Sequence, residues 1–183
     1  LSNSEFYRSG AVEHPIPALN HIQPFLEVDD LWTYYCCSQG VKVSNRFFAM
    51  PSYRNRILGL QLYQHNITGF LQWGYNFYYS QCSQRPINPY VVTDADYAFP
   101  SGDAFSVYPG DDGTAIPSLR LKVFLHGLQD IRALQLLETK LPREAILTLL
   151  RSQGALSFEE YPNNADFILA FREQINGLIK ALF

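Results

Sequence analysis

The stretch TGFLQWGYNFYY, residues 68–79, decides how this chain is expected to fold. Its first half contains Phe70, Leu71 and Trp73 and is apolar enough for a short, wholly buried strand. Its second half begins at Gly74 and has the small and polar residues of a strand that ends in a loop. An apolar strand leading into an aromatic, amide-bearing tip is a frequent way to build a ligand site on an α/β scaffold. The stretch therefore predicts both a central strand and a binding site.

A second strand and a helix are predicted just upstream. Residues 31–37 are rich in aromatic and β-favouring residues and indicate a buried strand. Pro51 suits the first turn of a helix, and apolar residues recur at helical spacing from Tyr53 to about His65. A strand, a helix and a strand joined by short connections predict a parallel crossover unit.

The rest of the chain is predicted to be a long loop followed by helices. Residues 80–103 show no periodicity, which is typical of a functional or disordered loop. A short strand is expected at 104–108, and helices at 118–139, from Pro142 to just before Gly154, and at about 164–182. The apolar stripe of the first of these helices is expected to contain Leu121, Phe124, Leu125, Leu128, Ile131 and Leu134.

Composition and charge argue against a nucleic-acid partner, a membrane span, a disulfide framework and a metal site. The net charge is −3, so without a basic excess a nucleic acid is not expected as partner. No apolar run reaches the length of about 18 residues that a membrane span needs. Cys36, Cys37 and Cys82 form no disulfide framework, and no metal-ligand spacing occurs, so neither a metal nor another cofactor is expected. The free cysteines and the lack of a signal peptide in this segment favour a cytoplasmic location.

Five motifs in the same order resemble a known family. They are LWTYYCC at 31–37, NRFFAMPSYRNRILG at 45–59, GFLQWGYNFY at 69–78, GDAFSVYPG at 102–110 and SLRL at 118–121. Together they are similar to the C-terminal part of the catalytic region of glycoside hydrolase family 123, long catalogued as domain of unknown function 4091. The resemblance covers about residues 5–140.

The resemblance implies an α/β fold, the C-terminal portion of a (β/α)8 TIM-type barrel with about three strands and four helices. A complete closed barrel is not expected in a chain of this length. We expect a partial barrel at residues 1–140 and a helical C-terminal extension at 141–183 packed on the same core. Three strands leave two unpaired edges, which either an upstream barrel segment or a second copy of the chain is expected to cover.

The family resemblance also implies a function. Characterised members are similar to β-N-acetylgalactosaminidases, in which the substrate's own acetamido oxygen is the nucleophile and an adjacent Asp–Glu pair assists. That pair has no counterpart among the paired carboxylates of this chain, because Asp29–Asp30 precedes a strand, Asp111–Asp112 lies in a turn and Glu159–Glu160 lies beyond the resemblance. Gln72 is a further departure, since the family more often has His there.

Two functions from different classes follow. The first is a segment of a glycoside hydrolase that binds an N-acetylhexosamine glycan. It contributes binding residues and no catalytic residue, so this chain by itself is expected to be inactive, and whether the chain is part of an active enzyme stays open. The alternative is a non-catalytic interaction or structural domain that assembles with another subunit. The residues expected to contact sugar are Gln72, Trp73, Tyr75, Asn76, Trp32 and Tyr34.

Strand alternation assigns faces to these residues. Gln72 and Asn76 share one face, and a glutamine buried against apolar helices is costly, so both amides are expected to face the barrel axis near its mouth. The alternative is that these amides bind loop backbone. Trp73 is then expected to face the helices unless the strand bends outward. Its ring either stacks on a sugar or fills the core, and the same two roles are open for Trp32 and Tyr34.

Charged residues near these motifs have simpler expected roles. Arg46, Arg54 and Arg56 are expected to form ion pairs on helix surfaces in preference to binding a ligand. Asp103 is expected to cap a loop, with contact to a ligand as the alternative.

Overall fold

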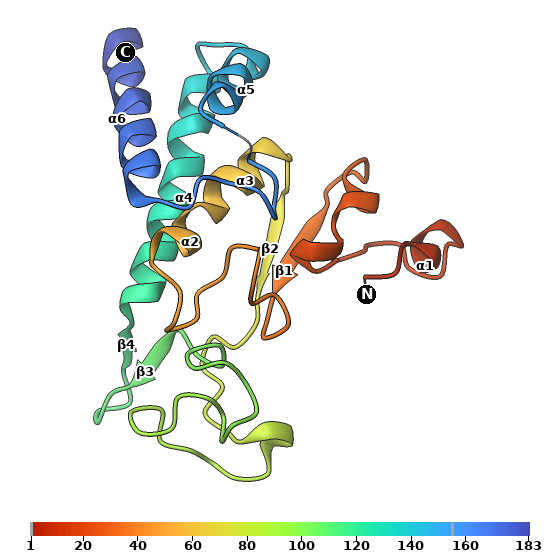
Figure 1. Cartoon of the computed structure of the whole chain (residues 1–183), viewed down its shortest axis with the longest axis vertical. Helices are drawn as coiled ribbons and strands as arrows, with labels where there is room; N and C mark the ends of the chain where they lie inside the picture. Colours follow the sequence, from red (N-terminus) through yellow and green to blue (C-terminus); the bar gives the residue numbers. More distant parts are fainter. Residues whose placement is uncertain (1, 155) are drawn as a thin grey trace.

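The computed structural model describes residues 2–154 and 156–183 (Figure 1). Its helices are α1 (Ser4–Arg8), α2 (Tyr53–Arg56), α3 (Leu58–Gln64), α4 (Leu119–Glu138), α5 (Arg143–Ser152) and α6 (Ala165–Leu182), and its 3-10 turns are η1 (Leu19–His21), η2 (Gln23–Phe25) and η3 (Gln81–Ser83). Its strands are β1 (Trp32–Tyr35), β2 (Gly69–Gln72), β3 (Val107–Pro109) and β4 (Ala115–Pro117).

The predicted strand–helix–strand unit is confirmed. Strands β1 and β2 are parallel, with Trp32 opposite Gly69 and Tyr35 opposite Gln72, and the connection between them contains α2 and α3. The single expected helix is recorded as two segments that meet at Ile57, whose φ of −57° and ψ of −26° remain helical. On the other side of β1, Ala18 forms a parallel bridge with Tyr34.

The third expected strand does not extend this sheet. Strand β3 pairs with β4 in antiparallel fashion, and residues 110–114 form the turn of this hairpin. Strand β4 has no counterpart in the prediction. An antiparallel bridge between Asn76 and Phe105 connects the segment before β3 to the chain after β2. Residues 2–154 and 156–183 thus form a mixed α/β fold without a closed barrel, and its relation to a TIM barrel stays a prediction.

The three C-terminal helices are confirmed, and side chains cap two of them. Ser118 Oγ accepts a hydrogen bond from Leu121 N at 3.2 Å at the start of α4, and Asn164 Oδ1 accepts one from Phe167 N at 2.7 Å at the start of α6. These hydroxyl and amide oxygens satisfy backbone N–H groups that a helix leaves free at its start. Each helix therefore begins where its local sequence predicts.

The expected apolar stripe of α4 is right in part. Leu134 is buried and Phe124 and Ile131 pack against the core, whereas Leu125 and Leu128 are exposed. Gly127 and Asp130, which the stripe did not include, are buried. Gly127 is buried because Gly59 of α3 lies against its carbonyl oxygen, and Asp130 is buried because Arg56 and Arg172 bind its carboxylate, each at 3.0 Å or less. Close backbone contact and ion pairing thus decide this face more than side-chain hydropathy does.

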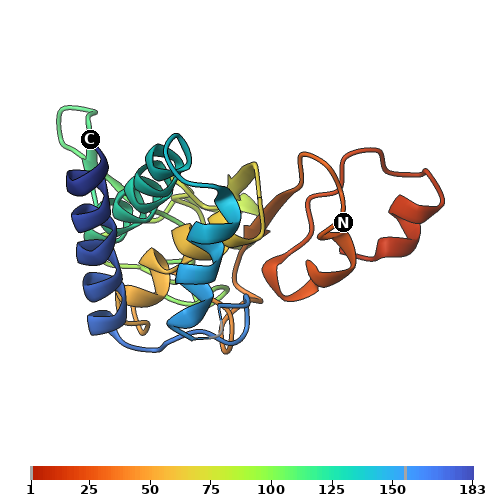
Figure 2. The same cartoon turned by 90° about the horizontal axis from the view of Figure 1, so that it is seen from above.

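The main core lies between α3, α4, α5 and α6. Its buried members come from both sides of residue 140 and include Ile57, Leu60, Leu134, Leu137, Ile146, Leu150, Phe171 and Ile175. A second cluster, with Tyr35 and Leu58, joins β1 to the N-terminal turns. Figure 2 shows the N-terminal segment reaching away from the helices, on the far side of the strands. No helix of the described chain is both long and apolar enough to cross a bilayer.

Candidate functional site

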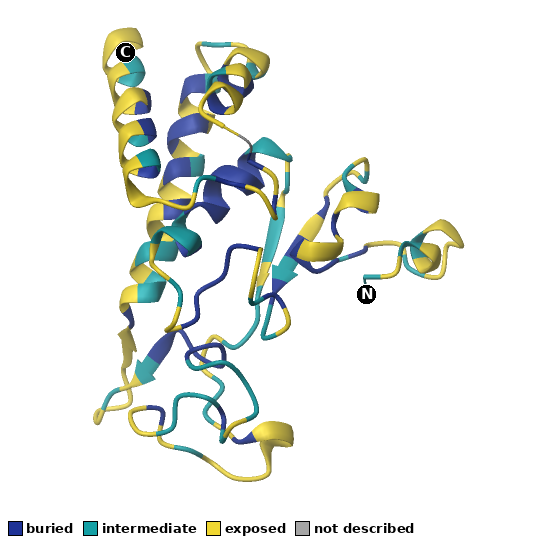
Figure 3. Cartoon of the chain, in the orientation of Figure 1, coloured by how far each residue is buried: buried dark blue, intermediate teal, exposed yellow. Residues whose placement is uncertain are grey.

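The helices cover only one face of the β1–β2 pair (Figure 3). On the covered face, Phe70 lies 5.7 Å from Phe124 of α4 and 4.8 Å from Tyr35, measured between ring centroids. On the open face, Trp32 and Leu71 are 46% and 45% exposed. The prediction that the strand at 69–72 is wholly buried was therefore wrong.

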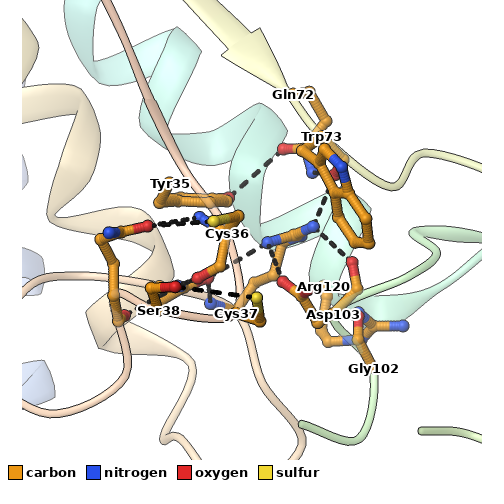
Figure 4. A network of polar contacts seen from close by, with 12 residues as sticks. Tyr35, Cys36, Cys37, Ser38, Gln72, Trp73, Gly102, Asp103 and Arg120 are labelled. Atoms are coloured by element: carbon orange, nitrogen blue, oxygen red, sulfur yellow. Dashed lines mark hydrogen bonds and ion pairs between the residues drawn. The ribbon is translucent and has the colours of Figure 1, made fainter. Parts of the chain in front are cut away.

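Gln72 lies on the covered face, so its expected orientation toward an open barrel axis was wrong. Its Oε1 accepts a hydrogen bond from the Tyr35 hydroxyl at 3.3 Å, and its Nε2 donates to the Trp73 carbonyl oxygen at 2.8 Å (Figure 4). A buried amide is costly only while it lacks partners, and here both ends of the amide have one. The open alternative, in which this amide binds protein backbone, describes Gln72 correctly.

Tyr35 is the centre of a buried polar network at the carboxyl end of β1. Its hydroxyl lies 3.4 Å from Asn55 Oδ1 as well as close to Gln72, and Asn55 Nδ2 donates to the Arg120 carbonyl oxygen at 2.8 Å. Burial raises the pKa of Tyr35 to about 12, against the opposing effect of Arg46. The tyrosine therefore stays neutral, and its single hydroxyl hydrogen is shared between the two amide oxygens.

Arg46 is buried at the same place, so its expected position on a helix surface was wrong. Its Nη1 lies 3.3 Å from Asp103 Oδ1, and its Nη2 donates to the Trp73 carbonyl oxygen at 2.6 Å and to the Asp103 carbonyl oxygen at 2.5 Å. Its guanidinium carbon lies 4.7 Å from the centroid of the Tyr35 ring. One side chain thus ties the loop after β1 to the end of β2 and to the loop before β3. The ion pair expected of Arg56 is confirmed, but its partner Asp130 is buried, so the pair does not lie on a helix surface. Arg54 binds the carbonyl oxygens of Val41 and Val43.

Asp103 is the carboxylate of this network and is fully buried. Burial raises its pKa to about 6, although Arg46 and then Arg120 favour the charged form. Its Oδ2 has no hydrogen-bond partner among the described residues, which explains why desolvation outweighs the ion pair. Asp103 therefore acts through Arg46 and the loop backbone, because no solvent-facing atom of it can contact a ligand.

Backbone hydrogen bonds join the tip that follows β2 to the residues before β3. Gly74 has a φ of +63°, and a Cβ there would lie 2.5 Å from the Asp103 carbonyl oxygen. Phe77 N donates to the Ala104 carbonyl oxygen at 3.0 Å, and Ser106 N donates to the Tyr75 carbonyl oxygen at 2.8 Å. The Tyr75 side chain of this tip is 45% exposed.

The aromatic residues expected to contact sugar are not all at this tip. Trp73 is half-buried, and its ring centroid lies 5.1 Å from that of Phe99. Asn76, three residues further along the chain, is exposed. Trp32 lies at the amino end of β1, three residues before Tyr35. At roughly 3.3 Å per residue, this places Trp32 about 10 Å from Tyr35 along the strand, with Tyr34 between them. The structure thus brings Gln72, Trp73, Tyr75 and Asn76 together and separates Trp32 from them.

Four residues of the network were not predicted as such: Tyr35 and Asn55, and Arg46 and Asp103 as a buried pair. One signal was present for the pair. Arg46 precedes Phe47 and Asp103 precedes Ala104 and Phe105, all of them buried, and charged residues placed directly beside core residues often pair with each other.

No adjacent carboxylates lie at the carboxyl ends of β1 and β2. Asp29–Asp30 precedes β1, Asp111–Asp112 is in the β3–β4 turn and Glu159–Glu160 follows α5. Over residues 2–154 and 156–183, no group of three or more His, Cys, Asp or Glu side chains converges as a metal site requires. The site therefore offers hydrogen-bonding groups and aromatic surface.

Residues 1–137 match the family described as glycoside hydrolase 123, catalytic domain. A search of curated proteins finds no match.

Proposed function

The chain belongs to glycoside hydrolase family 123, and we propose that it supplies the part of the family's site that binds an N-acetylhexosamine unit of a glycan. The resemblance to β-N-acetylgalactosaminidases supports this substrate class. The acid pair of such enzymes has no counterpart at the strand ends of this chain. We therefore propose that the chain contributes binding residues and no catalytic acid, and that by itself it does not hydrolyse glycosides.

The observation that carries this proposal is the tip at residues 73–76. Arg46 and Gln72 both donate to the Trp73 carbonyl oxygen, so the backbone of the tip is held from two sides. The Asn76 amide and the Tyr75 ring are left exposed on this rigid support. An amide that binds an acetamido group, next to an aromatic ring that covers a sugar face, is a combination suited to an N-acetylhexosamine.

The contribution of each expected residue follows from its placement. We propose Tyr75 and Asn76 as direct contacts, Trp73 as the aromatic wall behind them, and Gln72 as a residue that positions the tip through the Trp73 carbonyl. The open face with Tyr34 leads from this tip toward Trp32.

A binding experiment with exposed-residue variants tests the proposal. Saturation-transfer NMR with N-acetylgalactosamine is expected to detect binding to the intact chain, and galactose, which lacks the acetamido group, is expected to bind more weakly. Asn76→Ala should weaken N-acetylgalactosamine binding about fivefold, because it removes a hydrogen bond worth about 1 kcal/mol. Tyr97→Ala, at a tyrosine that is 93% exposed in the loop before β3, is the matched control and should change nothing. Equal binding by Asn76→Ala and the intact chain contradicts the proposal.

A second candidate function is a non-catalytic domain that assembles with another subunit. The observation that favours it is the half-exposed apolar surface of Trp32 and Leu71 on the uncovered face of the strands. Either a second copy of the chain or an upstream barrel segment would cover this face. Light scattering over a range of concentrations discriminates the candidates, because a stable monomer at every concentration removes self-assembly.

A further inference from the structure

A cavity lies at the amino ends of β1 and β2, at the opposite end of the strands from the Gln72–Asn76 tip. Its volume is about 320 Å³, and its lining includes His14, Ile16, Val28, Asp29, Asp30 and Trp32. Pockets for small ligands begin at about this size and combine apolar walls with a few polar groups. The cavity is therefore large enough for one sugar ring and has a suitable lining.

Trp32 forms a rigid wall of this cavity. A Cβ at position 69 would lie only 2.2 Å from atoms of the indole, so the ring rests directly against the Gly69 backbone. The side chain is nevertheless 46% exposed. A tryptophan that is held against backbone and still open presents a flat apolar surface that needs no reorganisation to receive a ring.

The polar groups of the cavity have capacity left for a ligand. Asp29 and Asp30 are exposed, and neither has an ion-pair partner among the described residues. Ionised carboxylates accept several hydrogen bonds each, and hydroxyl donors are the natural partners for them beside an aromatic surface.

We propose that the Trp32 cavity is a second carbohydrate site, which takes one pyranose ring stacked on the indole with its hydroxyls donating to Asp29 and Asp30. The substrate class rests on the proposed function, but the site is separate, because Trp32 pairs with Gly69 at one end of the strands and Gln72 ends β2 at the other. A glycan is then held at two points of the chain.

The two tryptophans allow both sites to be followed at once. Trp32 and Trp73 are the only tryptophans of the sequence, so the ¹⁵N-labelled chain has one indole N–H signal for each site. Assignment follows from Trp32→Phe. Titration with N-acetylgalactosamine is expected to shift both signals, each with its own dissociation constant. A Trp32 signal that does not move at saturating sugar overturns the second site, whatever the Trp73 signal does.

Variants separate this proposal from the proposed function. Asp29→Asn with Asp30→Asn keeps the shape of both side chains, and Asn tolerates the positive φ of +52° at position 30. This double variant should weaken the Trp32 response about fivefold, because neutral acceptors replace charged ones, and should leave the Trp73 response unchanged. Asn76→Ala should do the reverse. A shift of Trp32 that the double variant does not weaken contradicts the proposal.

A cationic ligand is the competing outcome, since two carboxylates beside an indole also suit an ammonium group. Choline and its neutral isostere 3,3-dimethylbutanol test this in the same titration. A Trp32 signal that moves with choline and not with N-acetylgalactosamine assigns the cavity to a cation and overturns the sugar site.

Discussion

Arg46 and Asp103 contact each other from positions 57 residues apart, and their burial changes the chemistry of both. Arg46 has partners on two carbonyl oxygens and a ring, but among the described residues neither its Nε nor one carboxylate oxygen of Asp103 has a hydrogen-bond partner. A buried ion pair contributes to stability only when its remaining polar atoms are satisfied. The pair therefore orients the loops around the tip at residues 73–76 at some cost in stability.

Asp103 gives the folded chain a pH dependence that can be measured. Its pKa rises from 3.8 to about 6 on folding, so the folded chain binds this proton more tightly than the unfolded chain does. The stability from this group is fully present below about pH 4 and is lost as pH rises through about 6. Two pKa units correspond to about 3 kcal/mol. Burial also lowers the pKa of His65, which changes stability in the opposite direction over the same range, so urea unfolding from pH 4 to 7 should show the loss as a difference between the intact chain and a variant without this carboxyl group.

Asp103→Asn is the variant that isolates this effect. The difference in free energy of unfolding between the intact chain and Asp103→Asn should change by about 2 to 3 kcal/mol across this pH range. Asp111→Asn, in the exposed β3–β4 turn, serves as the control. A difference that stays constant from pH 4 to 7 would show that Asp103 does not titrate there.

Among the elements, α3 and α4 approach each other most closely at two glycines. A Cβ on Gly59 would lie 2.1 Å from the Gly127 carbonyl oxygen, and a Cβ on Gly127 would lie 2.9 Å from the Arg56 carbonyl oxygen. Both obstacles are backbone atoms, which cannot turn away as a side chain can. The sequence pattern could not show this contact, because glycine scores as a weak helix former wherever it occurs.

Two matched glycine substitutions test this helix crossing. Gly59→Ala should destabilise the chain by about 1 to 3 kcal/mol or more, because the helices must move apart. Gly177→Ala in α6 meets nothing within 4 Å and should stabilise by about 0.5 to 1 kcal/mol through improved helix propensity. Midpoints of urea unfolding measure both. A neutral Gly59→Ala would mean that α3 and α4 are not in contact at this point.

At the scale of the whole molecule, we propose that the helical extension 141–183 is part of the same folding unit as residues 1–140. Ile146, Leu150 and Phe171 belong to one buried cluster with Leu60 and Leu134. Arg172 of α6 also binds the buried Asp130 of α4 at 2.9 Å. The family match ends at residue 137, just before the contribution of α5 and α6 begins.

Truncation after Lys140 tests this unity. Removing α5 and α6 exposes the buried cluster to solvent and removes Arg172, one of the two arginines that bind Asp130. The truncated chain is therefore expected to lose cooperative thermal unfolding and to aggregate. Circular dichroism melting beside size-exclusion chromatography of the two chains gives the comparison. A soluble 1–140 chain with a sharp transition would make the extension a separate unit.

The amino-acid sequence alone determined the elements that depend on local interactions. The capped helices α4 and α6, the break before Gly154 and the parallel pair β1 and β2 follow from spacing, caps and connection length. The tip after β2 was also located correctly, because an apolar run that ends at a glycine and an amide marks a strand end.

Tertiary structure alone decided which face of the strands the helices cover and which charges meet. Alternation divides β2 into two sets of residues but does not say which set lies against α4. Gln72 is on that face because Tyr35 and the Trp73 carbonyl oxygen satisfy its amide, and both lie within the fold, Tyr35 on a different strand. The burial of Asp103 likewise depends on Arg46, which is distant in sequence. Such pairings depend on contacts that no local pattern of residues encodes.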